Sequence, residues 1–259
     1  MAKKINTKLL AEICEVAGAP GHEQRVREIV LREVTSLVDE IKMDNMGNIV
    51  AIKKGNKDKR VMIGAHMDEI GFIVTHIDNK GFIYFHTLGG FDPKTLTAQR
   101  VIIHGKEDVM GVMGSKPIHL MNVADRKKVP TIKDYFIDTG RTKKDLEKII
   151  SVGDTITRDR KMIEMGECLN CKSLDNRVSV FILIEMFREM KKKPPYDVYG
   201  VFTVQEEIGI RGANVSALEI NPDFGFGLDT TIAWDTPGST KQEQVSALGD
   251  GACIKVMDS

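Results

Sequence analysis

The sequence predicts an α/β domain, a sheet flanked by helices, with a small and mostly β module inserted into it. Three observations predict this class. Apolar residues recur at helical spacing early in the chain, short β-type runs fill the middle, and strand and helix patterns alternate afterwards. We therefore divide the chain into a first α/β part (1–69), an inserted β-rich domain (70–164) and a second α/β part (165–259).

The first α/β part is predicted to contain two helices, a hairpin and a buried strand. The helices follow from apolar residues at helical spacing, and the hairpin from two apolar runs about a turn at Asn45 to Asn48. The last strand follows from a continuous apolar run, which suits a sheet covered on both faces. The segments are 9–14 and 26–37 for the helices, 41–43 and 49–52 for the hairpin, and 61–65 for the strand.

The inserted module is predicted from short β-type runs that turn residues separate, at 72–74, 82–85, 100–104 and 109–113. One helix pattern at 142–150, with Thr142 as its N-cap, interrupts them. The α/β pattern then resumes. Its segments are a helix at 176–191, a strand at 197–204, a helix at 211–218, and strands at 224–228 and 252–257.

The composition is that of an ordinary globular protein, with 42% hydrophobic and 29% charged residues. The 37 Lys and Arg residues balance the 37 Asp and Glu residues, so no excess charge favours nucleic acid or a membrane surface as a partner. The N-terminus has no apolar core of signal-peptide length, and no apolar run is long enough to span a bilayer. We therefore expect a cytoplasmic protein.

The four cysteines, at 14, 168, 171 and 253, include one Cys-x-x-Cys pair. A structural zinc site would need a second such pair or two histidines at matching spacing, and the sequence has neither. We therefore expect reduced thiols, as is usual in the cytosol.

Four short polar segments each lie just past a predicted strand or at a helix start. They are 65–69, 173–177, 204–209 and 227–230. In open α/β sheets, sites are built at the carboxyl ends of strands. One imidazole with several carboxylates is a ligand set that suits zinc, cobalt or manganese. The four segments therefore predict a metal site at one edge of the sheet.

The ligand types allow a pair of metal ions that share a carboxylate. Asp175 can bridge the two ions. His66 and Asp229 can complete one metal site, and Glu207 can hold the other ion. The sequence thus predicts a two-metal hydrolase.

Two further carboxylates have supporting roles in this hypothesis. Glu206 can take the proton of the attacking water, and Asp68 can accept a hydrogen bond from the second ring nitrogen of His66. Each feature alone has a plainer explanation, because a Glu-Glu pair is usually a solvated face and a lone Asp is usually a helix cap. Their joint occurrence at strand ends favours catalysis.

The motifs resemble those of the tetrahedral metallo-aminopeptidases along essentially the whole chain. This family includes glutamyl and deblocking aminopeptidases and members once labelled cellulases or endoglucanases. The motifs that carry the resemblance are Ala65-His66-Met67-Asp68-Glu69-Ile70-Gly71, Ser173-Leu174-Asp175-Asn176-Arg177, Gln205-Glu206-Glu207-Ile208-Gly209 and Leu228-Asp229.

The resemblance implies a two-metal exopeptidase fold whose inserted domain serves dimerisation, and dimers that assemble into a homo-oligomeric dodecamer. It implies hydrolysis of N-terminal residues from peptides with free N-termini, by a water that two divalent ions activate. Zinc or cobalt would be the metal, with manganese as a further choice. It also implies the metal ligands His66, Asp175, Glu207 and Asp229 and the base Glu206, with Asp68 behind the imidazole. The preferred N-terminal residue is not fixed.

The chain departs from the family pattern in one respect. The family requires another histidine on the second metal, from a segment near the C-terminus, and none of the six histidines here lies after position 119. The last residues also look like a strand in mid-domain. We therefore expect a chain that is truncated at its C-terminus, with an incomplete second metal site.

Two other functions remain open. An endoglucanase would use two carboxylates without a metal, and the grouping of His66 with four carboxylates argues against it. A truncated assembly subunit would be inactive and would hold one metal ion or none.

Overall fold

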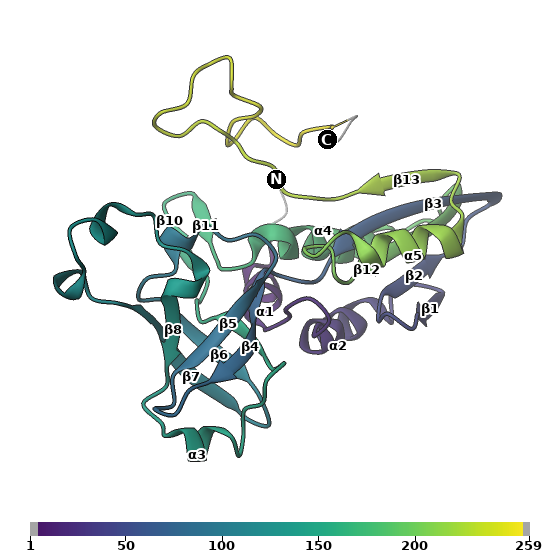
Figure 1. Cartoon of the computed structure of the whole chain (residues 1–259). Coiled ribbons are helices and arrows are strands. Elements are labelled where there is room, and N and C mark those ends of the chain that lie inside the picture. The colour runs from purple at the N-terminus through teal and green to yellow at the C-terminus, as the bar shows by residue number, and fades with distance from the viewer. Residues whose placement is uncertain (1–4, 256–259) are drawn as a thin grey trace.

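The structure, a computed structural model, describes residues 5–255 and contains a helix-covered sheet beside a closed barrel (Figure 1). The sheet has the strand order β1-β2-β12-β3-β13, and the barrel has the order β4-β5-β8-β7-β6-β9. Strands β10 and β11 form a separate antiparallel pair. The α/β class predicted from the sequence is therefore confirmed.

The elements have the following bounds. The helices are α1 (Thr7–Glu15), α2 (Gln24–Val34), α3 (Lys143–Leu146), α4 (Leu174–Glu189) and α5 (Arg211–Ile220), with short 3-10 turns η1 (Pro93–Thr95), η2 (Ile118–Leu120), η3 (Asp125–Lys127) and η4 (Ile132–Asp134). The strands are β1 (Glu40–Met43), β2 (Ile49–Lys53), β3 (Lys57–His66), β4 (Gly71–Ile77), β5 (Ile83–Leu88), β6 (Arg100–His104), β7 (Asp108–Ser115), β8 (Tyr135–Asp138), β9 (Thr155–Arg158), β10 (Ile163–Met165), β11 (Cys168–Asn170), β12 (Tyr196–Thr203) and β13 (Phe224–Gly227).

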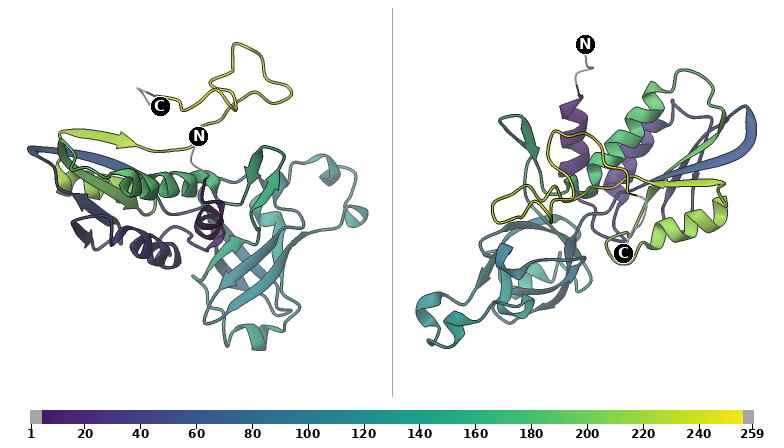
Figure 2. Two further views of the ribbon diagram at one scale, coloured as in Figure 1. Left: turned by 180° about the vertical axis from the view of Figure 1, so that it is seen from behind. Right: turned by 90° about the horizontal axis from the view of Figure 1, so that it is seen from above.

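Helices cover both faces of the five-stranded sheet (Figure 2). Successive residues of β2 point to opposite faces, so Ile49 and Ala51 pack with α1, α2 and α4, whereas Val50 and Ile52 pack towards α5. Strand β3 lies between β12 and β13 and runs parallel to both. The carboxyl ends of these three strands therefore lie at one edge of the sheet.

Helix α4 carries the apolar stripe that the sequence predicts. Val180, Ile184 and Phe187 are buried against α1, α2 and the sheet. The helix ends at Glu189, before Pro194 and Pro195, which cannot continue it. At its start, Asp175 and Asn176 have non-helical backbone angles, so this end departs from a regular first turn.

The barrel contains two strands, β8 and β9, that the sequence analysis missed. Both are only four residues long, and in β9 the single apolar residue Ile156 lies between Thr155 and Thr157, all three of them buried. Thr142 caps α3 as predicted, by accepting a hydrogen bond from the amide of Asp145. The helix predicted over 142–150 is too long, however, because α3 ends at Leu146 and a turn follows. The boundary 70–164 and its role in dimerisation stay predictions.

The strand predicted over 252–257 is wrong for its described part. Residues 252–255 are not in a strand, and Ile254 is 92% exposed, because no strand of residues 5–255 pairs with this stretch. Residues 256 and 257 lie outside the described range. Between residues 5 and 255, no helix has the length and apolar character that crossing a bilayer requires.

Candidate metal centre

The structure brings all six predicted site residues to the edge where the three parallel strands end. His66 is the last residue of β3, Glu206 and Glu207 follow β12, and Asp229 follows β13. Asp175 reaches the same place from the start of α4. The strand alignment produces this convergence, because β12 and β13 both pair with β3 in parallel register.

The carboxylates converge on one nitrogen of the buried imidazole. His66 is 3% exposed, and its Nε2 lies 3.3 Å from an oxygen of Asp175, 3.7 Å from Glu206 and 3.9 Å from Asp229. Two groups among the described residues have the spacing to hold a metal ion, with ligand atoms within 4.8 Å of one another. They are His66 with Asp175 and Asp229, and His66 with Glu206 and Glu207.

The second group differs in part from the predicted ligand set. The sequence analysis assigned Glu207 to an ion shared with Asp175, whereas the structure groups Glu207 with His66 and Glu206. The charge of Asp175 nevertheless contributes, after burial, to raising the pKa of Glu207. The two carboxylates therefore interact across the centre.

Asp68 holds both the imidazole and the loop after β12. The Nδ1 atom of His66 lies 3.1 Å from the carbonyl oxygen of Asp68 and 3.5 Å from its carboxylate. The carboxylate accepts hydrogen bonds from the backbone amides of Glu206 and Glu207, at 3.0 Å each. It thus fixes the two glutamates more directly than it orients the imidazole, which the sequence could not indicate.

Glu23 supports the same loop, and the sequence analysis missed it. Its carboxylate is buried and accepts hydrogen bonds from the amides of Gly21 (2.8 Å) and Gln205 (3.2 Å). Burial raises the pKa of Glu23. Three consecutive amides, of residues 205–207, are therefore held by two buried carboxylates. In the sequence Glu23 merely precedes a helix, so no signal marked it.

Arg177 holds the backbone directly after His66. It is fully buried, and its guanidinium donates to the carbonyl oxygens of Ile13 (2.6 Å), Val16 (3.2 Å) and Met67. Met67 lies between His66 and Asp68, so this contact ties the end of β3 to the end of α1. The sequence analysis placed Arg177 in a motif without assigning it a role.

A buried ion pair accompanies this arginine. Glu69 accepts a hydrogen bond from the Lys172 ammonium group and lies 3.8 Å from Arg177. All three side chains are buried. Two cations and one carboxylate are therefore buried together, and both cations depend on Glu69 for compensation of their charge.

Opposed effects act on the protonation of His66. Burial lowers the pKa of the imidazole, but hydrogen bonds with Asp175 and Asp68 and the charge of Glu206 raise it to about 10. The hydrogen bond with His66 lowers the pKa of Asp175 in turn. Without a metal ion, the imidazole is therefore a cation at neutral pH.

The two glutamates have the opposite shift. Burial, and then the charge of Asp175, raise the pKa of Glu207 to about 7. Burial likewise raises the pKa of Glu206. Burial disfavours the charged form of both carboxylates, and repulsion from the neighbouring carboxylates adds to this effect. This donor set therefore fits divalent cations, which would replace the proton on His66.

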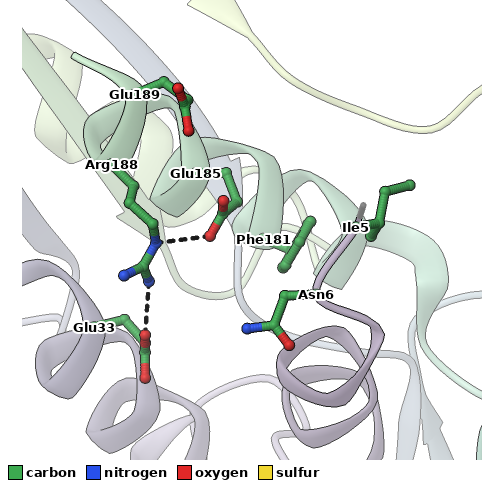
Figure 3. Close-up of a pocket in the computed structure, with 7 residues that line it drawn as sticks. All are labelled: Ile5, Asn6, Glu33, Phe181, Glu185, Arg188 and Glu189. Carbon is green, nitrogen blue, oxygen red and sulfur yellow. Dashed lines mark hydrogen bonds and ion pairs between the residues drawn. The ribbon is translucent and has the colours of Figure 1, made fainter. Parts of the chain in front are cut away.

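A separate hollow of about 400 Å³ lies between α2, α4 and the start of α1 (Figure 3). None of the residues of the metal centre lines it. Arg188 lines it and pairs with Glu33 and Glu185, at 2.8 Å each. The hollow is therefore distinct from the centre.

Comparison with known proteins shows the family. The sequence model of the M42 glutamyl aminopeptidase family matches residues 47–259, and the chain belongs to this family. This confirms the resemblance inferred from the motifs. The chain is accordingly an aminopeptidase by family, a hydrolase of the exopeptidase class, and the M42 peptidases are metallopeptidases.

Individual relatives agree with this assignment. A lysyl aminopeptidase of Pyrococcus furiosus is 32% identical over 260 residues, which cover 97% of this chain and 73% of that protein. An aminopeptidase structure from Desulfurococcus kamchatkensis is 38% identical, with a TM-score of 0.89 over 94% of this chain and 68% of that one. A Pyrococcus horikoshii peptidase, described as able to assemble into a tetrahedron or a large octahedral shell, is 30% identical, with a TM-score of 0.79 over 86% of this chain and 68% of that one.

Proposed function

We propose that this chain is a metal-dependent aminopeptidase that removes N-terminal residues from peptides with free N-termini. The observation that carries the proposal is the convergence of acidic side chains on Nε2 of the buried His66. Family membership supports the reaction class. The raised pKa values of Glu206 and Glu207 support the need for cations between them.

The spacing of the donor atoms supports one ligand set, in which His66, Asp175 and Asp229 would hold one divalent ion. As the motifs imply, Asp175 with Glu207 would hold a second ion, although the donor spacing groups Glu207 with His66 and Glu206 instead. Zinc or cobalt suits these nitrogen and oxygen donors, and manganese is a further choice. When bound, such ions polarise the scissile carbonyl and anchor the terminal amine of the peptide.

Glu206 would act as the general base. Its carboxylate is partly buried and lies 3.7 Å from Nε2 of His66, on the side where the ligands converge. Burial raises its pKa, which makes the carboxylate a better proton acceptor near neutral pH. Asp68 and Glu23 hold the amides on which this position depends.

The proposal extends to assembly and location. We infer a cytoplasmic homo-oligomer in which the β-rich domain at 70–164 joins two subunits and dimers build a dodecamer. Similarity to a peptidase that assembles into closed shells supports this. On the barrel, Met110 and Val112 of β7 are exposed by 49% and 44%, as suits an apolar contact surface.

A pair of isosteric variants separates the base from the ligands. Glu206→Gln should keep metal affinity and lower kcat by roughly 10²–10⁴-fold, because general-base catalysis contributes about that much. Glu207→Gln should instead weaken metal binding, since it removes a charged ligand. Calorimetric metal titration and peptide turnover of both variants check this. A fully active Glu206→Gln enzyme would show that the base is another residue.

The two alternative functions give different results with a chelator. An endoglucanase that uses only two carboxylates should survive removal of metal, whereas the proposed peptidase should lose its activity and regain it with added zinc or cobalt. An inactive subunit should bind one ion or none and show no turnover. The number of ions per chain, measured by elemental analysis, separates it from the two-metal enzyme.

A further inference from the structure

Away from the metal ligands, two thiols from distant parts of the chain lie in one packed region. Cys14 is near the end of α1, and Cys171 directly follows β11 and packs against the buried core cluster to which Cys14 belongs. Cys14 is fully buried, whereas Cys171 is partly exposed. The two segments are close, because the Ser173 hydroxyl donates to the carbonyl oxygen of Cys14 at 2.5 Å. An enclosed thiol and an accessible thiol therefore share one site.

The surroundings of Cys171 stabilise a thiolate. The hydrogen bond from Cys14 contributes most to lowering its pKa to about 6, and the amides of Lys172 and Ser173 act in the same direction. The same hydrogen bond and burial raise the pKa of Cys14. The shared proton therefore stays on Cys14, and Cys171 is the nucleophile of the pair.

We propose that Cys171 is a reaction site for hydroperoxides and that Cys14 resolves the oxidised Cys171 into an intramolecular disulfide. The proposal rests on the packing of Cys171 against the core cluster that contains Cys14, the unequal exposure of the two thiols and the closeness of their backbones. It is independent of the proposed peptidase activity, because neither residue belongs to the metal centre.

The chemistry balances in two steps. The Cys171 thiolate attacks one peroxide oxygen, the O–O bond breaks, and the departing alkoxide or hydroxide takes a proton from solvent. The Cys14 sulfur then attacks the sulfenic sulfur. The S–O bond breaks, and the hydroxyl leaves as water with the thiol proton. One hydroperoxide is reduced, and two thiols are oxidised to one disulfide.

Cys168 is the competing partner, because it forms a Cys-x-x-Cys pair with Cys171. It is exposed and lies in β11, opposite Met165 of β10. The packing of Cys171 against the cluster that contains Cys14 favours Cys14 over this neighbour in sequence. A disulfide with Cys14 would link α1 to the stretch that leads into Asp175, where Arg177 already joins α1.

The experiment treats the reduced, folded chain with stoichiometric hydrogen peroxide in the presence of a chelator. Remaining thiols are then blocked, and the products are mapped by mass spectrometry. We expect loss of the mass of two hydrogen atoms and a single cross-linked peptide that joins Cys14 to Cys171. The Cys168→Ala control should give the same cross-link in the same yield.

Two variants complete the test. Cys14→Ala should give no cross-link and should accumulate a sulfenic acid on Cys171, which a 1,3-diketone reagent traps. Cys171→Ser, at a partly exposed position, should fold normally and lose the cross-link altogether. A cross-link between Cys168 and Cys171, or oxidation of Cys168 or Cys253 while Cys171 stays reduced, would overturn the proposal.

Discussion

At the scale of single residues, the metal centre depends on buried charged groups that lie behind the predicted ligands. Asp68 and Glu23 hold the amides of the loop that carries the proposed base. Arg177 holds the carbonyl oxygen between His66 and Asp68. These side chains position the backbone that carries the proposed ligands. Their contribution should be measurable in the free energy of unfolding.

Arg177 provides the clearest case. Arg177→Met should destabilise the protein by about 3–5 kcal/mol, because it leaves buried carbonyl oxygens unpaired and removes a cation from beside Glu69. The matched control is Arg188→Met on the same helix, which breaks partly exposed ion pairs and should cost about 1 kcal/mol or less. Urea unfolding of both variants measures the difference. Equal losses would contradict the role given to Arg177.

The sequence indicated the proposed ligands and Asp68, but not Glu23 or the role of Arg177. The proposed ligands were recognisable because one histidine and several carboxylates each lie just past a predicted strand or at a helix start. Glu23 and Arg177 form their contacts with residues that are distant in the chain, such as Gln205 and Met67. No local pattern encodes such contacts.

At the scale of elements, an ion pair joins helix α2 to the barrel. The Arg25 guanidinium donates two hydrogen bonds to the carboxylate of Asp108, at 2.6 and 2.7 Å. His104 contacts the same carboxylate at 2.8 Å and Thr157 of β9 at 2.9 Å. The turn between β6 and β7 is therefore fixed to the sheet domain.

This contact predicts a pH dependence of stability. The hydrogen bonds with Arg25 lower the pKa of Asp108 from its usual 3.8 to about 2. The stabilisation is therefore complete above about pH 4 and is lost as the pH falls towards 2. Asp108→Asn should lower the stability by at most about 1 kcal/mol at pH 7, because both partners are substantially exposed.

The test compares thermal unfolding midpoints from pH 7 down to pH 3. The difference between the native chain and Asp108→Asn should shrink at the acid end. Glu107→Gln is the control, because its neighbouring ion pair with Arg141 is 3.3 Å long and exposed. A difference that stays constant with pH would show that the carboxylate charge does not join the two parts.

The elements themselves were predictable to different degrees. The α4 stripe and the runs of β2, β3 and β12 were visible because each is long or strongly apolar. Strands β8 and β9 are only four residues long, and buried Thr155 and Thr157 interrupt the apolar pattern of β9. Their pairing in the barrel, rather than local sequence, determines that they are strands.

At the scale of the whole molecule, the strand order creates the site. Strand β12 comes late in the chain but inserts between β2 and β3, and β13 adds at the far side of β3. This order places Asp229 beside His66, with the Leu228 amide bonded to the carbonyl of Gly64 at 2.8 Å. A sequence predicts alternating strands and helices, but it does not state which distant strands become neighbours.

The most direct test of the central claim compares two peptides of the same sequence, one with a free N-terminus and one N-acetylated. The purified chain is assayed with zinc or cobalt, and again with a chelator. The account predicts release of the first residue from the free peptide alone, only with metal present. Release from the acetylated peptide, release that survives the chelator, or no release with either ion would contradict it.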